Sequence, residues 1–170
     1  MTDMRLFIAI QLEPRMKEYL TTVQDQFRAR NIRGNYTPEE NLHLTLAFIG
    51  EHPRPEEVMD ALSEVPFEPF EITLDHVGCF GDLWWIGLKE APALKLLVQR
   101  IRHALTEAGI PYDKKRFRAH ITLLRRADLS KGQPGAITTE PISMTVTSVS
   151  LMRSTQGKHG MIYTEIGELR

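Results

Sequence analysis

The sequence predicts an α+β fold made of two pseudo-symmetric lobes, with mainly antiparallel sheets around a central groove. Strand-like and helical segments are mixed along the 170 residues, and several strands follow one another directly, which disfavours a doubly wound parallel sheet. The order of strand, proline-led helix, loop and strand also occurs twice. Because this length is typical of one domain, we expect residues 1–170 to form a single domain with two internal lobes.

The expected elements follow in chain order. Residues 5–12 (RLFIAIQL) are a short apolar run suited to a buried strand. Pro14 begins a helix with apolar side chains at helical spacing as far as residue 27, Pro55 begins a short helix, and Pro92 begins the clearest one, which Gly109 caps. Further strands are expected at residues 42–48, 70–77, 83–88, 119–124, 142–152 and 161–166, with loops at residues 31–41 and 131–135 and turns at Gly78, at Gly81-Asp82 and around residues 157–160.

Composition excludes several classes of protein. The 21 Lys and Arg side chains against 22 Asp and Glu give a net charge of -1, so any site for a polyanion has to be a local patch. The single cysteine, Cys79, excludes an internal disulfide framework and a cysteine-rich zinc site. Residues 1–5 lack a signal-peptide pattern, and no apolar run approaches the roughly 20 residues that span a bilayer. We expect a cytoplasmic monomer that does not bind membranes.

A short motif recurs in the two repeated units. Its two copies are Leu42-His43-Leu44-Thr45-Leu46 and Ala119-His120-Ile121-Thr122-Leu123, offset by 120 − 43 = 77 residues, and the prolines that begin the preceding helices are offset by 92 − 14 = 78. Side chains alternate between the faces of a strand, so in each copy the histidine and threonine share one face and the apolar residues share the other. If the lobes oppose each other, both histidines and both threonines meet across a groove.

Two imidazoles and two hydroxyls in one groove suit hydrolysis of a phosphodiester without a metal or another cofactor. A neutral imidazole can take a proton from water, and an imidazolium can protonate the departing oxygen. Threonine hydroxyls can donate to the phosphate oxygens. The alternatives are two unrelated surface His/Thr pairs, an RNA-binding module whose histidines only contact phosphate, and a metal protein; the last is disfavoured because two histidines are too few ligands.

At these residues the chain resembles the two-histidine phosphoesterase superfamily. More closely, it is similar to the bacterial and archaeal RNA 2′,3′-cyclic phosphodiesterases, once described as 2′-5′ RNA ligases. The resemblance runs nearly end to end, and it is carried by residues 5–9, 40–51 and 117–125. One departure is Ala119, where the family often has proline.

The resemblance implies two α+β lobes around a groove and opening of a terminal 2′,3′-cyclic phosphate on RNA, or on small cyclic nucleotides, to a 2′-phosphomonoester. It implies that His43 is the proton donor to the leaving 3′ oxygen, that His120 is the proton acceptor that activates water, and that Thr45 and Thr122 hold the phosphate. The same site run in reverse would form 2′-5′ linkages, although water at high concentration favours hydrolysis.

A basic segment flanks the second motif and supplies candidates for substrate binding. Residues 113–126 contain six Lys and Arg side chains, which suit an RNA backbone. We expect Arg125, at a position that is commonly basic in the family, to be the phosphate-side charge, with Arg118 second. Phe48 and Tyr36 are candidates for stacking on a base, whereas His159, in a glycine-flanked loop, is not promoted to the site.

Overall fold

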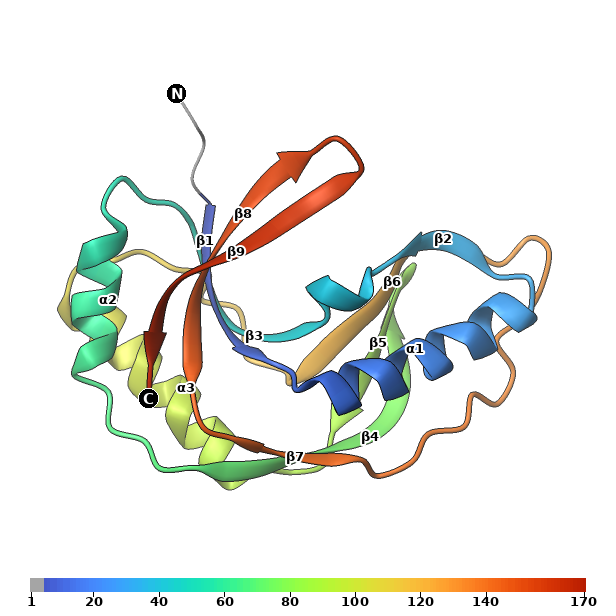
Figure 1. Ribbon diagram of the computed structural model, residues 1–170, viewed down its shortest axis with the longest axis horizontal. Helices are drawn as coiled ribbons and strands as arrows, with labels where there is room; N and C mark the ends of the chain where they lie inside the picture. Colours follow the sequence, from blue (N-terminus) through green and yellow to red (C-terminus); the bar gives the residue numbers. More distant parts are fainter. Residues whose placement is uncertain (1–4) are drawn as a thin grey trace.

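Two antiparallel sheets carry the fold, and the two motif strands lie where the sheets meet (Figure 1). The computed structural model describes residues 5–170; residues 1–4, on which most of the signal-peptide prediction rests, lie outside this range. The first sheet has the order β3 (His43–Glu51), β1 (Arg5–Gln11), β8 (Val149–Gly157) and β9 (Gly160–Leu169). The second has the order β2 (Arg33–Tyr36), β6 (His120–Asp128), β5 (Leu83–Leu88), β4 (Phe70–Phe80) and β7 (Ser143–Val146).

The two sheets repeat one arrangement, which confirms the predicted fold class. The order β3-β1-β8-β9 matches β6-β5-β4-β7, and each motif strand pairs with the strand that precedes a proline-led helix. Ile10 pairs with Leu44, and Ile86 pairs with Ile121, so the structural offset of these two strands is 86 − 10 = 76 residues. The offset of 78 taken from the prolines is therefore two residues too large, a shift that keeps every side chain on the same face.

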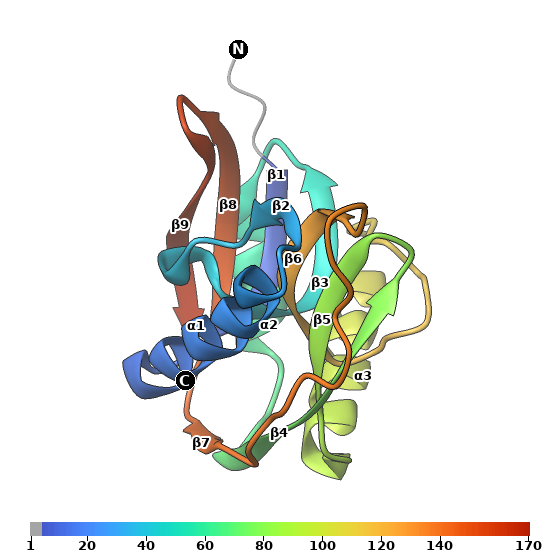
Figure 2. The same ribbon diagram turned by 90° about the vertical axis from the view of Figure 1, so that its right-hand side faces the viewer.

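The helices connect the two halves of the molecule. All three begin at proline, as predicted: α1 (Pro14–Ala29), α2 (Pro55–Ser63) and α3 (Pro92–Glu107). Figure 2 shows α1 and α3 on opposite sides of the strands. Helix α1 follows β1 of the first sheet but contacts β6 of the second. Helix α3 follows β5 of the second sheet but contacts β3 of the first. The aromatic rings of Phe27 in α1 and Trp84 in β5 meet edge to face, with centroids 5.5 Å apart. Each half therefore packs a helix against the other half.

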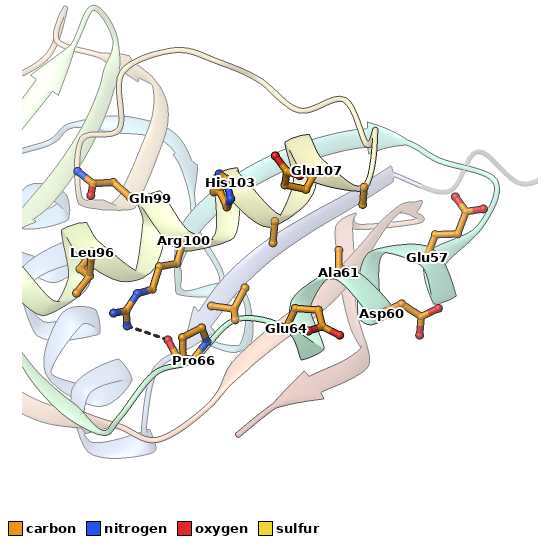
Figure 3. Close-up of a pocket in the computed structure, with 13 residues that line it drawn as sticks. Glu57, Asp60, Ala61, Glu64, Pro66, Leu96, Gln99, Arg100, His103 and Glu107 are labelled. Atoms are coloured by element: carbon orange, nitrogen blue, oxygen red, sulfur yellow. Dashed lines mark hydrogen bonds between the residues drawn. The ribbon is translucent and has the colours of Figure 1, made fainter.

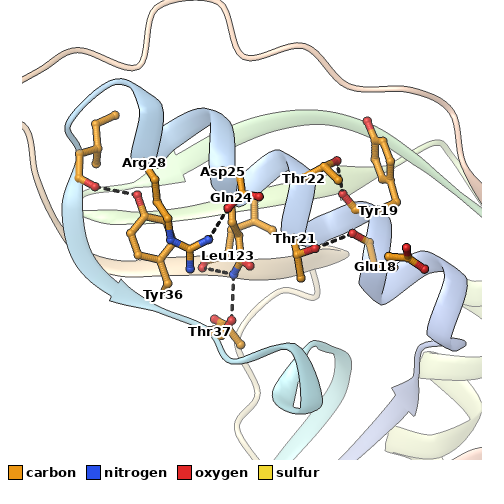
Figure 4. A network of polar contacts seen from close by, with 11 residues as sticks. Glu18, Tyr19, Thr21, Thr22, Gln24, Asp25, Arg28, Tyr36, Thr37 and Leu123 are labelled. Atoms are coloured by element: carbon orange, nitrogen blue, oxygen red, sulfur yellow. Dashed lines mark hydrogen bonds and ion pairs between the residues drawn. The ribbon is translucent and has the colours of Figure 1, made fainter.

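A buried amide ties α1 to the second motif strand (Figure 4). The Gln24 side chain is only 1% exposed, and its Nε2 donates to the Thr37 and Leu123 carbonyl oxygens, each at 2.9 Å. Thr37 also donates its hydroxyl to the Thr122 carbonyl oxygen at 3.0 Å. Because unpaired polar groups are costly to bury, these bonds fix the path of the chain beside the second motif.

Three sequence predictions are wrong in detail. The loop predicted for residues 31–41 contains β2 and the 3₁₀-helix η1 (Glu39–Asn41). Gly78 lies inside β4, and the turn is formed at Gly81-Asp82 alone. The strand predicted for residues 142–152 is two strands, β7 and β8, which belong to different sheets. Within residues 5–170, no helix is long and apolar enough to cross a membrane.

Candidate active site

The motif side chains lie on the predicted faces of their strands. His43 and Thr45 are half-buried, whereas Leu44 between them is fully buried in the core. In β6, His120 and Thr122 are likewise half-buried beside the fully buried Ile121. Strand β3 is an edge strand of the first sheet, β2 pairs with β6 from Leu124 onward, and β3 contacts β6. The predicted alternation is confirmed in both lobes.

A bulge occurs at the same place in both motif strands. Thr45 and Ala47 pair with consecutive residues of β1, which leaves Leu46 as the extra residue. Thr122 and Leu124 pair in the same way with consecutive residues of β5, which leaves Leu123 as the extra residue. An extra residue reverses the alternation beyond it.

Phe48 and Arg125 are the equivalent residues beyond the two bulges, because 48 + 77 = 125. Each lies five residues after its motif histidine, so in a regular strand its side chain would point to the other face of the sheet. The structure instead exposes both, and each lines a cavity with motif residues. The two lobes thus present an aromatic ring and a cation at matching positions of the groove.

His43 is held by hydrogen bonds on both ring nitrogens. Its Nδ1 lies 2.7 Å from the Asn41 carbonyl oxygen, and its Nε2 lies 2.7 Å from the Thr45 hydroxyl. The rings of Phe7 and Tyr163 pack against the imidazole with centroid distances of 5.1 and 5.2 Å. A carbonyl can only accept, so Nδ1 carries a proton and Nε2 faces the hydroxyl. Burial of the ring lowers the pKa of His43, although the hydrogen bond to Asn41 opposes the shift.

His120 has a similar orientation in the second lobe. Its Nδ1 lies 2.6 Å from the Arg118 carbonyl oxygen, which again leaves Nε2 as the nitrogen available for chemistry. The rings of Phe80 and Trp85 lie 5.4 and 6.4 Å from the imidazole centroid. The Trp85 ring packs directly over Gly78, because a Cβ atom at residue 78 would lie 2.4 Å from the indole ring and would clash with it. In each histidine, Nδ1 is therefore held by a backbone carbonyl, and two aromatic side chains pack against the imidazole ring.

Two cavities border the motif strands, and each combines parts of both motifs. The larger, of about 680 Å³, contains His43 and Thr122, and the smaller, of about 270 Å³, contains Thr45 and His120. Each histidine therefore shares its cavity with the threonine of the other lobe. The remaining residues of the larger cavity are Asn35, Tyr36, Thr37, Pro38, Asn41, Arg125, Arg126, Gln156, His159, Gly160, Met161 and Tyr163.

The sequence-predicted binding residues divide between these cavities. Arg125 lines the larger one, whereas Phe48 and Arg118 line the smaller one. The Arg118 guanidinium lies 5.9 Å from the centroid of the Phe80 ring. Tyr36 is at the larger cavity, but its hydroxyl donates to the Ile32 carbonyl oxygen at 2.7 Å.

Several residues of the groove were not predicted from the sequence. His159, which was not expected in the site, lines the larger cavity with Tyr163 and with Arg126 of the predicted basic segment. Arg126 has a φ of 52°, a left-handed conformation that is uncommon for a residue with a side chain. Phe80 lies at the end of β4, next to the predicted Gly81-Asp82 turn. An apolar residue beside a turn was the only sequence signal for Phe80.

A further cavity, of about 870 Å³, lies between α2 and α3 and contains none of the motif residues (Figure 3). It is lined by Glu57 and Asp60 of α2, by Glu64 just after this helix, and by His103 and Glu107 of α3. Elsewhere too, residues 5–170 bring together no group of three or more His, Cys, Asp or Glu side chains that suits a metal ion.

Comparisons with known proteins agree with this geometry. Residues 14–158 match the model of the 2′-5′ RNA ligase superfamily. The RNA 2′,3′-cyclic phosphodiesterase of Archaeoglobus fulgidus is 34% identical over 130 residues, 72% of each chain, and that of Escherichia coli is 33% identical over 131 residues, again 72% of each. The crystal structure of E. coli LigT complexed with 3′-AMP superposes with a TM-score of 0.80 at 27% identity, covering 99% of this chain and 98% of that one. The chain belongs to the 2′-5′ RNA ligase superfamily.

Proposed function

We propose that this chain is a metal-independent enzyme that hydrolyses a terminal 2′,3′-cyclic phosphate on RNA to a 2′-phosphomonoester. One observation carries the proposal: each cavity of the groove combines the histidine of one lobe with the threonine of the other. A phosphate bound where the two cavities adjoin would be surrounded by two proton-transfer groups and two hydroxyl donors. The relatives from A. fulgidus and E. coli are RNA 2′,3′-cyclic phosphodiesterases, which supports the same substrate class.

The two histidines would transfer protons on opposite sides of the phosphorus. In this mechanism, Nε2 of neutral His120 takes a proton from water as the water oxygen bonds to phosphorus. The bond from phosphorus to the 3′ oxygen breaks, and protonated His43 donates a proton to that oxygen from Nε2. The products are a free 3′ hydroxyl and a 2′-phosphate, and the two histidines regain their starting states by exchange with solvent.

The hydroxyls and arginines would hold the phosphate during this transfer. Negative charge accumulates on the non-bridging oxygens, where Thr45 and Thr122 can donate hydrogen bonds. Arg125, at the His43 end, adds a positive charge that also disfavours protonation of free His43. An anionic phosphate offsets this repulsion, so substrate binding itself would favour the charged His43 that the reaction requires.

The smaller cavity offers a surface for the base of the terminal nucleoside. The side chains of Phe48 and Phe80 are 53% and 40% exposed beside His120, although both are large and apolar. Arg118 lies over the Phe80 ring and can contribute a cation–π contact. Stacking on exposed rings tolerates every base, which suits an enzyme that acts on RNA ends of varied sequence.

Replacement of Phe48 by alanine is expected to raise KM about 10-fold and leave kcat nearly unchanged, because base stacking contributes about 1–3 kcal/mol to binding. Steady-state kinetics on a dinucleotide with a 2′,3′-cyclic phosphate measure both constants. The matched control is Leu96→Ala, which removes another exposed apolar side chain, 44% exposed on α3 and outside the groove. An unchanged KM in Phe48→Ala would reject the stacking role.

The proposed function is tested by incubating the protein with an oligoribonucleotide that ends in a 2′,3′-cyclic phosphate. We expect a product with a 2′-phosphate and a free 3′ hydroxyl, identified by phosphorus NMR, and an unchanged rate in excess EDTA. The oligonucleotide carries a 5′ phosphate, so no 5′ hydroxyl competes with water and the ligating reaction is prevented. Binding without turnover would instead support a non-catalytic RNA-binding module, and EDTA inhibition reversed by a single metal would support a metal enzyme.

We also propose that the enzyme works as a monomer in the cytoplasm. Cys79 is a free, exposed thiol, which suits a reducing compartment. The groove takes both motifs from one chain, so no second copy is needed to complete it.

A further inference from the structure

The two histidines differ in how their carbonyl partners are held. Each Nδ1 bonds to the carbonyl two residues earlier, which belongs to Asn41 in the first lobe and to Arg118 in the second. Asn41 is only 8% exposed, whereas Arg118 is exposed. The residue that supplies the acceptor for His43 is therefore held by its own buried side chain, whereas the residue that supplies the acceptor for His120 has its side chain in solvent.

The anchor is a hydrogen bond to a distant strand. Asn41 Nδ2 donates to the Met161 carbonyl oxygen at 2.9 Å, across 120 residues of sequence. Met161 belongs to β9, and Tyr163, two residues further along, packs edge-on against the His43 ring. The Asn41 side chain thus links the Asn41 carbonyl, which orients the His43 ring, to strand β9, whose Tyr163 packs against that ring.

We propose that Asn41 is a positioning residue that aims Nε2 of His43 at the leaving oxygen by clamping the 3₁₀-helix before the motif to β9. The inference rests on the proposed function, in which His43 is the general acid. A fixed carbonyl holds the Nδ1–H tautomer and the ring angle. Loss of such alignment in an active site costs up to about 100-fold in rate for a displacement of about 1 Å.

Asn41→Ala and Asn41→Asp separate positioning from folding because they act on His43 in opposite directions. Alanine releases the carbonyl that favours the imidazolium, so the pKa of His43 falls. Aspartate keeps the shape but also loses the bond to Met161, because a carboxylate can only accept, and its negative charge raises this pKa. The other charged or titratable groups that face His43 are Lys17 of α1, Arg125 and His120 of β6, and Tyr163 of β9, and both variants leave them in place.

An acid must be protonated to act, so activity falls as the pH rises through the pKa of His43. The alkaline limb of kcat/KM is therefore expected to move to lower pH in Asn41→Ala and to higher pH in Asn41→Asp. We expect kcat of Asn41→Ala to fall about 10- to 100-fold with KM changed less than threefold. Gln26→Ala is the matched control, because it also removes a side-chain amide that donates to a distant backbone carbonyl, that of Thr138 at 2.7 Å, but it lies outside both motif cavities.

Nitrogen NMR of the substrate-free protein gives the decisive readout. It should show the pKa of His43 displaced in opposite directions by the two Asn41 variants and unmoved in Gln26→Ala, whatever their melting temperatures. An unmoved His43 titration in Asn41→Ala, or the same displacement in Gln26→Ala, would overturn the positioning role. Because this readout needs no turnover, an enzyme inactive on cyclic phosphate would reject the proposed function alone.

Discussion

Replacement of either His43 or His120 by alanine is expected to lower kcat by about 10²–10⁴-fold, since each removes one of the two proton transfers. The loss should fall on kcat, because the hydroxyls and arginines that hold the phosphate remain. His103→Ala, on the exposed face of α3, is the control that should retain full activity. Nearly normal turnover in either motif variant, with the control intact, would reject the two-histidine mechanism.

A modified substrate distinguishes the acid from the base. When sulfur replaces the 3′ oxygen of the cyclic phosphate, the leaving group departs as a thiolate and does not need a proton. His43→Ala should therefore recover most of its activity on this substrate, whereas His120→Ala should remain slow. Recovery in His120→Ala alone would reverse the two roles.

Replacement of Thr45 or Thr122 by valine is expected to lower kcat about 10²-fold, because one hydroxyl donor to the phosphate oxygens is worth about 2.7–4 kcal/mol at most in comparable sites. Valine keeps the branched shape that the strand favours. The expected effects differ in kind. Thr45 also bonds to Nε2 of His43, so its variant should change the pH profile as well, whereas Thr122→Val should change only the rate.

The control for both substitutions is Thr22→Val on α1, where the hydroxyl is exposed and donates to the Tyr19 carbonyl oxygen. Its kinetic constants should match those of the unsubstituted enzyme. If Thr45→Val and Thr122→Val also kept normal kcat, the phosphate would have to be held by the arginines alone, and the hydroxyl role would be wrong.

Local patterns were enough to predict the elements that bury an apolar face. The prolines that begin α1, α2 and α3 and the alternation around both motifs act within a few residues. Gly109 is also a local signal. It has a φ of 70° and ends α3, where the backbone N–H groups of residues 109 and 110 donate to the Thr106 and Leu105 carbonyls. Such signals depend on steric and hydrogen-bonding preferences that the sequence states directly.

Contacts between distant segments explain what was missed. Strand β2 reads as a loop because it is short and polar, and it forms because Gly34 lets it approach β6: a Cβ there would lie 2.6 Å from the Leu124 side chain. The paired bulges are set by register against β1 and β5 and leave no mark in the sequence. Tyr163 reaches His43 only because β9 joins the first sheet.

The central claim is that His43 and His120 act on one phosphorus, and binding of a product tests it most directly. A nucleoside 2′-phosphate is titrated into protein labelled with nitrogen-15 at histidine. We expect the Nε2 signals of His43 and His120 to shift together with a single dissociation constant, while those of His52 and His103 stay fixed. A shift of only one motif histidine, or two different dissociation constants, would contradict the account.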